Sequence, residues 1–124
     1  EINEIKNNLL INHIATLKHF YATCFINRKE YKAFFKQFGQ ASLSLYTQEE
    51  LIEGLNYLAA QHLSKTCDKL NKIKAKITFI NGNKDQLAPV SEIMIIINKF
   101  KKDNGLFQFI NYENKGHFLF EYYN

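Results

Sequence analysis

The sequence predicts an α/β fold in which a helical first half is followed by a strand–helix–strand segment. Apolar residues recur at steps of three and four through the first sixty or so residues, which is the period of amphipathic helices. Two short β-prone runs, at about 75–80 and 106–112, then flank a helical pattern of about a dozen residues. Strands separated in this way are normally parallel and joined by a crossover helix.

The first two helices are expected at residues 2–25 and 28–38. The first has one apolar face, formed by Ile5, Leu9, Leu10, Ile14, Leu17, Tyr21 and Phe25. The second is expected to stop at Gly39, because glycine commonly ends helices. The small and polar residues at 40–46 then predict a loop.

The third helix has a clear start in the sequence. Thr47 and Glu50 have the spacing of a capping box, in which each side chain accepts a hydrogen bond from the other residue's backbone N–H. The helix is expected to reach about Leu63, with an inward face formed by Leu51, Leu55 and Leu58.

The second half carries turn residues directly after each predicted strand, at 81–85 and at 113–117. Pro89 opens a predicted helix at 90–102, and the lysines near its end suit the negative pole of the helix dipole. Two strands do not form a stable sheet alone, and parallel strands are normally covered on both faces. Since the first residue is also not Met, we expect the chain to be part of a larger fold.

Composition and charge narrow the classes of function. The hydrophobic share of 46% supports a packed core, and the scattered positive charges behind the net charge of +4 favour an acidic partner rather than nucleic acid. Cys24 and Cys67 lack metal-ligand spacing and are expected to be reduced, packed thiols of a cytoplasmic protein. We expect no metal and no other cofactor. We also expect no membrane partner, since no apolar run is long enough to span a bilayer and no signal peptide is visible.

The two turns carry a specific resemblance. A strand followed by Gly82-Asn83-Lys84-Asp85, then Pro89 opening a helix, then a strand followed by Gly116-His117, resembles the end of an α/β-hydrolase. The resemblance implies that Asp85 is the acid and His117 the base of a catalytic triad. It also implies that residues 1–64 form a helical lid and residues 65–124 the last two parallel strands of the hydrolase core. The N-terminal half of such a fold is absent from this chain.

The serine nucleophile of the triad is not found. The motif G-x-S-x-G is formed by none of the serines, which are Ser42, Ser44, Ser64 and Ser91. The expected partner is therefore an N-terminal half that carries the serine, on the same or a separate chain, without which this chain is expected to be inert. The remaining histidines, His13, His19 and His62, lie on helical patterns and are expected to be ordinary helix residues.

The segment Gly116-His117-Phe118-Leu119-Phe120 resembles the esterases that cleave the methyl ester of pimeloyl-acyl carrier protein in biotin synthesis. The resemblance implies a serine carboxylesterase whose substrate is a dicarboxylate methyl ester on an acidic acyl carrier protein. The chain departs from that family in lacking the serine half and in carrying Lys where related lids often carry Arg. Two alternatives stay open: an α/β-hydrolase for another ester or lipid, and a non-enzymatic basic module that binds an acidic partner.

Two groups of lid residues fit such a substrate. The cations Arg28, Lys32 and Lys36 are spaced to share one helix face, with Lys29 beside them, and could dock the acidic carrier protein. The same spacing equally fits a solvated surface. The aromatic residues Phe34, Phe35 and Phe38 could line an acyl channel, although aromatic stripes of this kind usually pack into a core.

Overall fold

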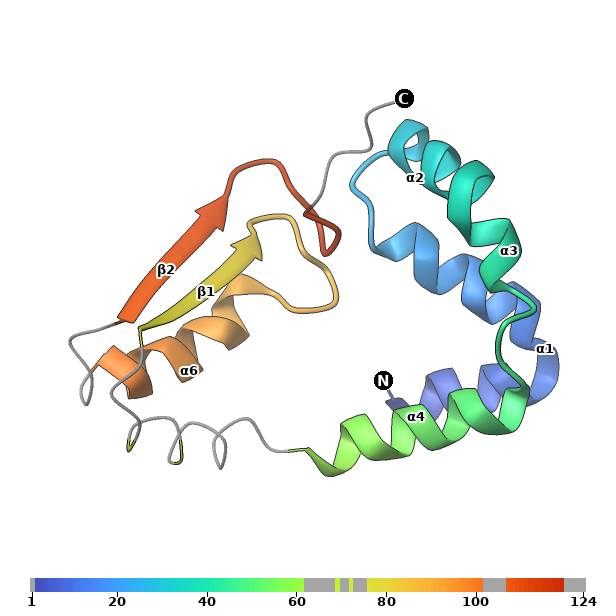
Figure 1. The fold of residues 1–124 in the computed structure, drawn as a ribbon, viewed down its shortest axis with the longest axis horizontal. Helices are drawn as coiled ribbons and strands as arrows, with labels where there is room; N and C mark the ends of the chain where they lie inside the picture. Colours follow the sequence, from blue (N-terminus) through green and yellow to red (C-terminus); the bar gives the residue numbers. More distant parts are fainter. Residues whose placement is uncertain (1, 62–68, 70–71, 73–75, 102–106, 120–124) are drawn as a thin grey trace. The chain divides into compact units, whose positions relative to one another are not determined.

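A computed structural model of the chain describes residues 2–61, 69, 72, 76–101 and 107–119 (Figure 1). These residues belong to two compact units, which divide after Gln61. The first unit contains the helical elements α1 (Ile2–Thr23), α2 (Arg28–Phe34), η1 (Phe35–Gly39), α3 (Gln40–Ser42) and α4 (Gln48–Ala60). The second contains β1 (Ile77–Gly82), α6 (Val90–Lys101) and β2 (Phe107–Tyr112). The expected lid boundary, between residues 64 and 65, lies outside the described residues.

Helix α1 has the predicted extent but is bent at Asn12. The backbone of Asn12 is non-helical, with φ −156° and ψ 92°, and its side-chain oxygen accepts the Ala15 N–H (3.0 Å). Asparagine favours this because its short side chain can cap a helix and so competes with the helical backbone. The prediction that the helix has a single apolar face is therefore wrong in part, because Leu9 is buried whereas Leu10 and Ile14 are exposed.

The second helix does not end at Gly39 as predicted. The chain continues from α2 through a π-helical turn, η1, into α3, and Gly39 has ordinary helical angles (φ −63°, ψ −37°). The expected loop at 40–46 thus begins with helical residues. A Cβ atom at position 39 would overlap the ring of Phe35. This glycine therefore permits close packing of an aromatic side chain and does not terminate the helix.

Helix α4 begins as its sequence predicts. The Glu50 N–H donates to the Thr47 hydroxyl (3.2 Å), and the Thr47 N–H donates to the Glu50 carboxylate (2.8 Å). The helix ends at Ala60, earlier than expected, because Gln61 is already extended. Of the three leucines expected to face inward, Leu58 is 62% exposed, since it lies in the last turn of the helix.

In the second unit, β1 and β2 pair in parallel, as the crossover connection through α6 predicts. Residues pair in register from Ile77 with Phe107 to Gly82 with Tyr112. Both strands therefore end at the same edge, and the loop after each begins at the same level of the sheet (Figure 1). This register brings the two predicted turns together.

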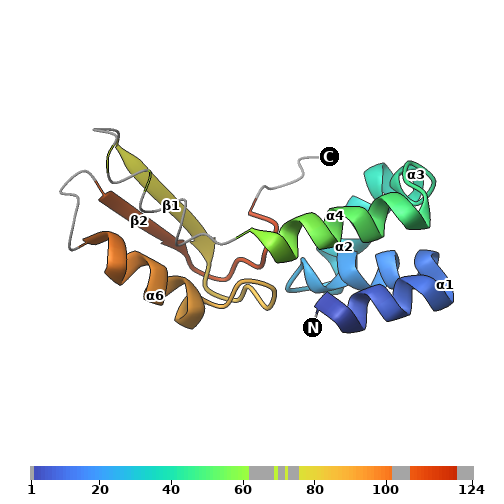
Figure 2. The same ribbon diagram turned by 90° about the horizontal axis from the view of Figure 1, so that it is seen from below.

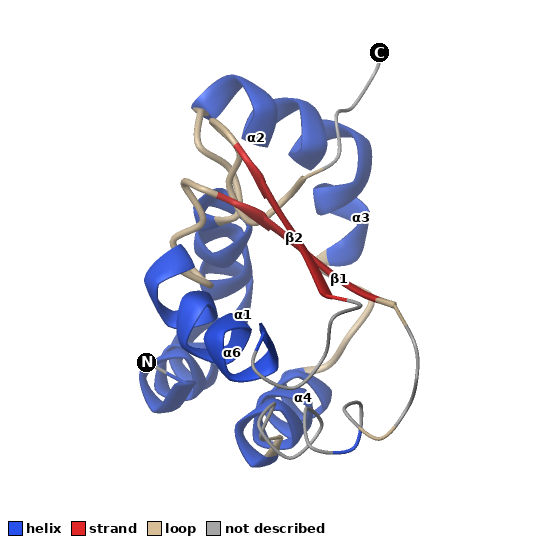
Figure 3. Cartoon of the chain, turned by 90° about the vertical axis from the view of Figure 1, so that its left-hand side faces the viewer, coloured by secondary structure: helices blue, strands red, loops and turns tan. Residues whose placement is uncertain are grey.

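Helix α6 covers one face of this strand pair, as the views in Figures 2 and 3 agree. Phe79 of β1 lines a cavity together with Ile93 and Ile96 of α6, and Ile97 of α6 is fully buried. Because side chains alternate between the faces of a strand, the neighbouring Ile80 points to the opposite face. Ile80 is 50% exposed, and so within this unit the second face stays open to solvent.

Candidate catalytic dyad

Asp85 is fixed by the turn that follows β1. Its backbone N–H donates to the carbonyl of Gly82 (3.1 Å), which closes the turn. Its side-chain oxygen Oδ1 accepts the backbone N–H groups of Leu87 (2.8 Å) and Ala88 (2.9 Å). The side chain is only 3% exposed, and two hydrogen bonds to one oxygen leave its orientation little freedom. The second carboxylate oxygen, Oδ2, is thereby held in a defined position.

That second oxygen contacts His117. The Nδ1 atom of His117 lies 2.9 Å from Asp85 Oδ2, although the two residues are 32 positions apart in the chain. An ionised carboxylate only accepts hydrogen bonds, so the contact requires a hydrogen on Nδ1. In a neutral imidazole the other nitrogen, Nε2, is then an acceptor. The His117 side chain is 47% exposed, which leaves part of the ring accessible to a reactant.

Besides the contact between Asp85 and His117, hydrogen bonds between other described residues join the two loops. The backbone N–H groups of Asn83 and Lys84 donate to the carbonyls of Tyr112 (3.0 Å) and Lys115 (2.9 Å). A third uses a side chain, since the Asn114 N–H donates to Asn83 Oδ1 (2.8 Å). Of the residues in the first loop, Asp85 was predicted from the sequence to be functional and Asn83 was not.

Gly82, the first residue of the G-x-x-D turn, is required by the same close approach. A Cβ atom built at this position would overlap the backbone carbonyl groups of Lys115 and Gly116. Gly82 and Gly116 are both buried. The glycine in each motif thus lies where the two loops cross, beside the residue proposed to act in catalysis.

Asn81 is a second residue that sequence analysis missed. It is only 5% exposed, and its side-chain Nδ2 donates to the carbonyls of Gly82 (3.0 Å) and Ala88 (3.4 Å). A buried amide of this kind is normally kept because its hydrogen bonds are satisfied within the protein. Here they tie the end of β1 to the backbone that binds the Asp85 carboxylate. The only sequence signal was a polar residue at the end of an apolar strand.

The serine hydroxyls of the first unit are hydrogen-bonded within that unit. The hydroxyl of Ser42 bonds the Tyr21 hydroxyl (2.9 Å) and the Gly39 carbonyl (2.8 Å), and that of Ser44 donates to the Ala41 carbonyl (3.2 Å). Ser91 is exposed on α6. Within the described part of the second unit, Ser91 is not hydrogen-bonded to the imidazole of His117.

The side chains that could bind a metal ion do not cluster into a metal site in the described part of the chain. Across the described ranges, no group of three or more His, Cys, Asp or Glu side chains is placed to hold a metal ion. Cys24 is buried, and its thiol donates to the Phe20 carbonyl (3.4 Å). His13 and His19 lie on α1, half-buried and exposed respectively, while Cys67 and His62 fall outside the described residues.

The predicted docking cations are all exposed. Arg28, Lys29 and Lys32 lie on α2, whereas Lys36 lies in η1. The expected common face assumed α-helical spacing throughout, and a π-helical turn contains more residues than an α-helical one. The common face of Arg28, Lys32 and Lys36 therefore stays a prediction. The docking role of these four residues stays a prediction.

The three phenylalanines predicted to bind substrate form a packed aromatic cluster. The ring centroid of Phe34 lies 5.1 Å from that of Phe25 and 5.5 Å from that of Tyr21. Phe35 contacts the ring of Tyr31 at 5.7 Å, and Phe38, which is partly exposed, lies 6.2 Å from Phe34. These contacts are typical of a core, the alternative that aromatic stripes favour, and an acyl-channel role stays a prediction.

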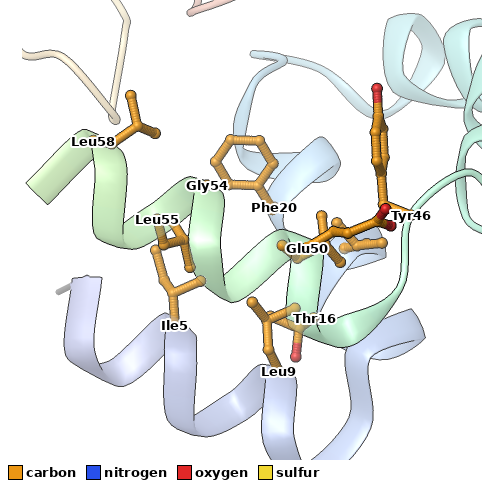
Figure 4. Close-up of a pocket in the computed structure, with 11 residues that line it drawn as sticks. Ile5, Leu9, Thr16, Phe20, Tyr46, Glu50, Gly54, Leu55 and Leu58 are labelled. Atoms are coloured by element: carbon orange, nitrogen blue, oxygen red, sulfur yellow. The ribbon is translucent and has the colours of Figure 1, made fainter.

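An apolar groove that the sequence did not predict lies between α1 and α4 (Figure 4). Its volume is about 330 Å³, within the usual size range of ligand sites. Ile5 and Leu9 of α1 point toward α4, which contributes Leu55 and Leu58 to the lining. None of the three phenylalanines of the aromatic cluster lines it.

Comparison with protein-family models, with curated proteins and with solved structures found no match. The resemblance to α/β-hydrolases thus stays a prediction, as does the catalytic role of Asp85 and His117. Over the described residues, no helix is both long and apolar enough to cross a membrane. The geometry of the dyad is therefore the firmest ground for a functional proposal.

Proposed function

We propose that this chain supplies the acid and the base of a serine carboxylesterase. The observation that carries the proposal is the 2.9 Å contact between His117 Nδ1 and the buried Asp85 carboxylate. A carboxylate that binds Nδ1–H holds the imidazole in the tautomer whose Nε2 can accept a proton. A half-exposed histidine fixed in this way suits a general base better than a purely structural ion pair.

The nucleophile in this proposal is a serine on a segment outside the 124 residues. Nε2 of His117 removes the proton of the serine hydroxyl as its oxygen attacks the ester carbonyl, and then gives that proton to the departing alcohol. Water, activated by the same nitrogen, hydrolyses the acyl-enzyme and regenerates the serine. Backbone N–H groups of the serine-bearing segment stabilise the oxyanion.

The proposed substrate is a methyl ester of a dicarboxylate carried on an acidic acyl carrier protein in the cytoplasm. The sequence resemblance at residues 116–120 is its main support. The exposed cations of α2 suit an acidic carrier, and the apolar groove between α1 and α4 suits a substrate with a hydrocarbon chain.

The test is ester hydrolysis by the complete polypeptide and its His117→Ala variant. The variant is expected to lose hydrolysis while binding of substrate persists, because only proton transfer is removed. His19→Ala, which changes an exposed histidine on α1, is the matched control and is expected to retain full activity. Wild-type rates in His117→Ala would show that the dyad is not catalytic. Equal rates on carrier-linked and free esters would instead show that the substrate is a different ester.

A further inference from the structure

Unlike the two backbone hydrogen bonds described above, the hydrogen bond from Asn114 to Asn83 uses a side chain outside the dyad to join the dyad loops. Those two join backbone groups and depend only on the path of the chain. The third requires the side-chain oxygen of Asn83 as acceptor. It is therefore the one of these three cross-loop bonds that the identity of a side chain controls.

The donor of this bond has an uncommon conformation. Asn114 has a φ of 55° and is in the left-handed region, which residues other than glycine adopt at a cost. Such a residue persists when its surroundings hold it in place. The 2.8 Å bond to Asn83 Oδ1 supplies a contact of that kind.

The hydrogen bond between Asn83 and Asn114 joins the two loops a few residues before each member of the dyad. Asn83 lies two residues before Asp85, and Asn114 lies three residues before His117. We propose that Asn83 is a positioning residue, which keeps His117 Nδ1 on Asp85 Oδ2 by holding the histidine loop at Asn114. Its contribution to catalysis rests on the function proposed above, but its effect on the imidazole does not.

The experiment is nuclear magnetic resonance of the ¹⁵N-labelled complete polypeptide, which reports which ring nitrogen of His117 carries the hydrogen. The His117 signals are assigned by their absence in His117→Gln. Wild type is expected to show a slowly exchanging Nδ1 proton. Asn83→Ala is expected to lose that signal and to show averaged ring-nitrogen shifts, because the loop no longer holds the ring on Asp85.

Three variants separate positioning from a general effect on stability. Asn83→Asp keeps an acceptor oxygen and is expected to restore the Nδ1 proton signal. Asn114→Gly keeps the N–H donor and removes the cost of the left-handed backbone, so its signal is expected to match wild type. Asn98→Ala changes an exposed asparagine on α6, outside both loops, and is expected to change nothing at His117.

The proposal is overturned by an unchanged Nδ1 proton in Asn83→Ala, or by its equal loss in Asn83→Asp or Asn98→Ala. Because the readout needs no ester, absence of hydrolysis in the complete polypeptide would refute the esterase without affecting this result. Conversely, an active esterase whose Asn83→Ala variant keeps the wild-type tautomer would refute only the positioning role.

Discussion

Replacing Asp85 by Asn removes the charge of the carboxylate while keeping its shape. The amide oxygen of the substituted side chain can still accept the Leu87 and Ala88 N–H groups, which lie 2.8 and 2.9 Å from Oδ1 in wild type. The amide nitrogen then faces His117 Nδ1. Since an amide NH₂ group only donates, Nδ1 must become the acceptor and the hydrogen must move to Nε2. That tautomer cannot take a proton from a serine.

The change of tautomer determines how much activity the variant is expected to lose. In a serine-protease triad the same change lowers kcat by about 10⁴-fold. This corresponds to about 5 kcal/mol of lost transition-state stabilisation. The cost to folding is expected to be far smaller, at most about 2 kcal/mol, because charged hydrogen bonds are replaced by neutral ones and none is left unmade.

Kinetics and denaturation together test the argument. Hydrolysis is measured on the complete polypeptide, and the free energy of unfolding is measured by urea titration of the same preparation. Asp85→Ala serves as comparison: it leaves the two N–H groups without an acceptor and is expected to be less stable than Asp85→Asn by about 2 kcal/mol. A decrease in kcat of less than tenfold in a folded Asp85→Asn protein would refute the proposed tautomer control.

Four further variants test the loops of the dyad, helix α4 and the cations of α2. Gly82→Ala is expected to lower the free energy of unfolding by about 2 kcal/mol or more in urea titration, since its Cβ would overlap backbone; Gly54→Ala in α4, where a Cβ meets nothing within 4 Å, should raise it by about 0.5–1 kcal/mol. Thr47→Ala removes the cap of α4 and should lower the free energy of unfolding by about 1 kcal/mol in the same assay. An unchanged midpoint of the urea transition would contradict the stabilising role of the capping box. The double variant Arg28→Glu, Lys32→Glu should raise KM for carrier-linked esters about tenfold and leave KM for free esters unchanged. An equal rise in KM for both kinds of ester would refute the docking role.

Features set by local chemistry were predictable from the sequence. The capping box at Thr47 and Glu50 forms as expected because both partners lie within one helical turn. The strand–turn–helix–strand order of the second unit was also predicted from the sequence. The contact between Asp85 and His117 was expected only from the resemblance to α/β-hydrolases. The structure explains it, because β1 and β2 pair in parallel, so that both end at the same edge and the turn residues after each strand become neighbours.

Features set by contacts between distant residues were not predictable. Gly39 has the sequence signature of a helix end, yet the packing of the Phe35 ring determines its role. The bend of α1 depends on whether the Asn12 side chain caps the helix or faces solvent, and both occur for asparagine in helical sequences. The side chain of Asn83 bonds a residue 31 positions away, so nothing in its own turn marks it as different from Lys84.

Two features of the second unit have a single explanation in the proposed enzyme. One is chemical: the buried Asp85 carboxylate bonds Nδ1 of the half-exposed His117 ring, and Ser91, the serine described in this unit, is not hydrogen-bonded to that ring. The other is structural, since parallel strands are normally covered on both faces and α6 covers only one, leaving Ile80 and Tyr112 about half exposed. A segment that carries the serine on a further parallel strand, with its own helix, would cover the open face and place a hydroxyl at the edge where β1 and β2 end.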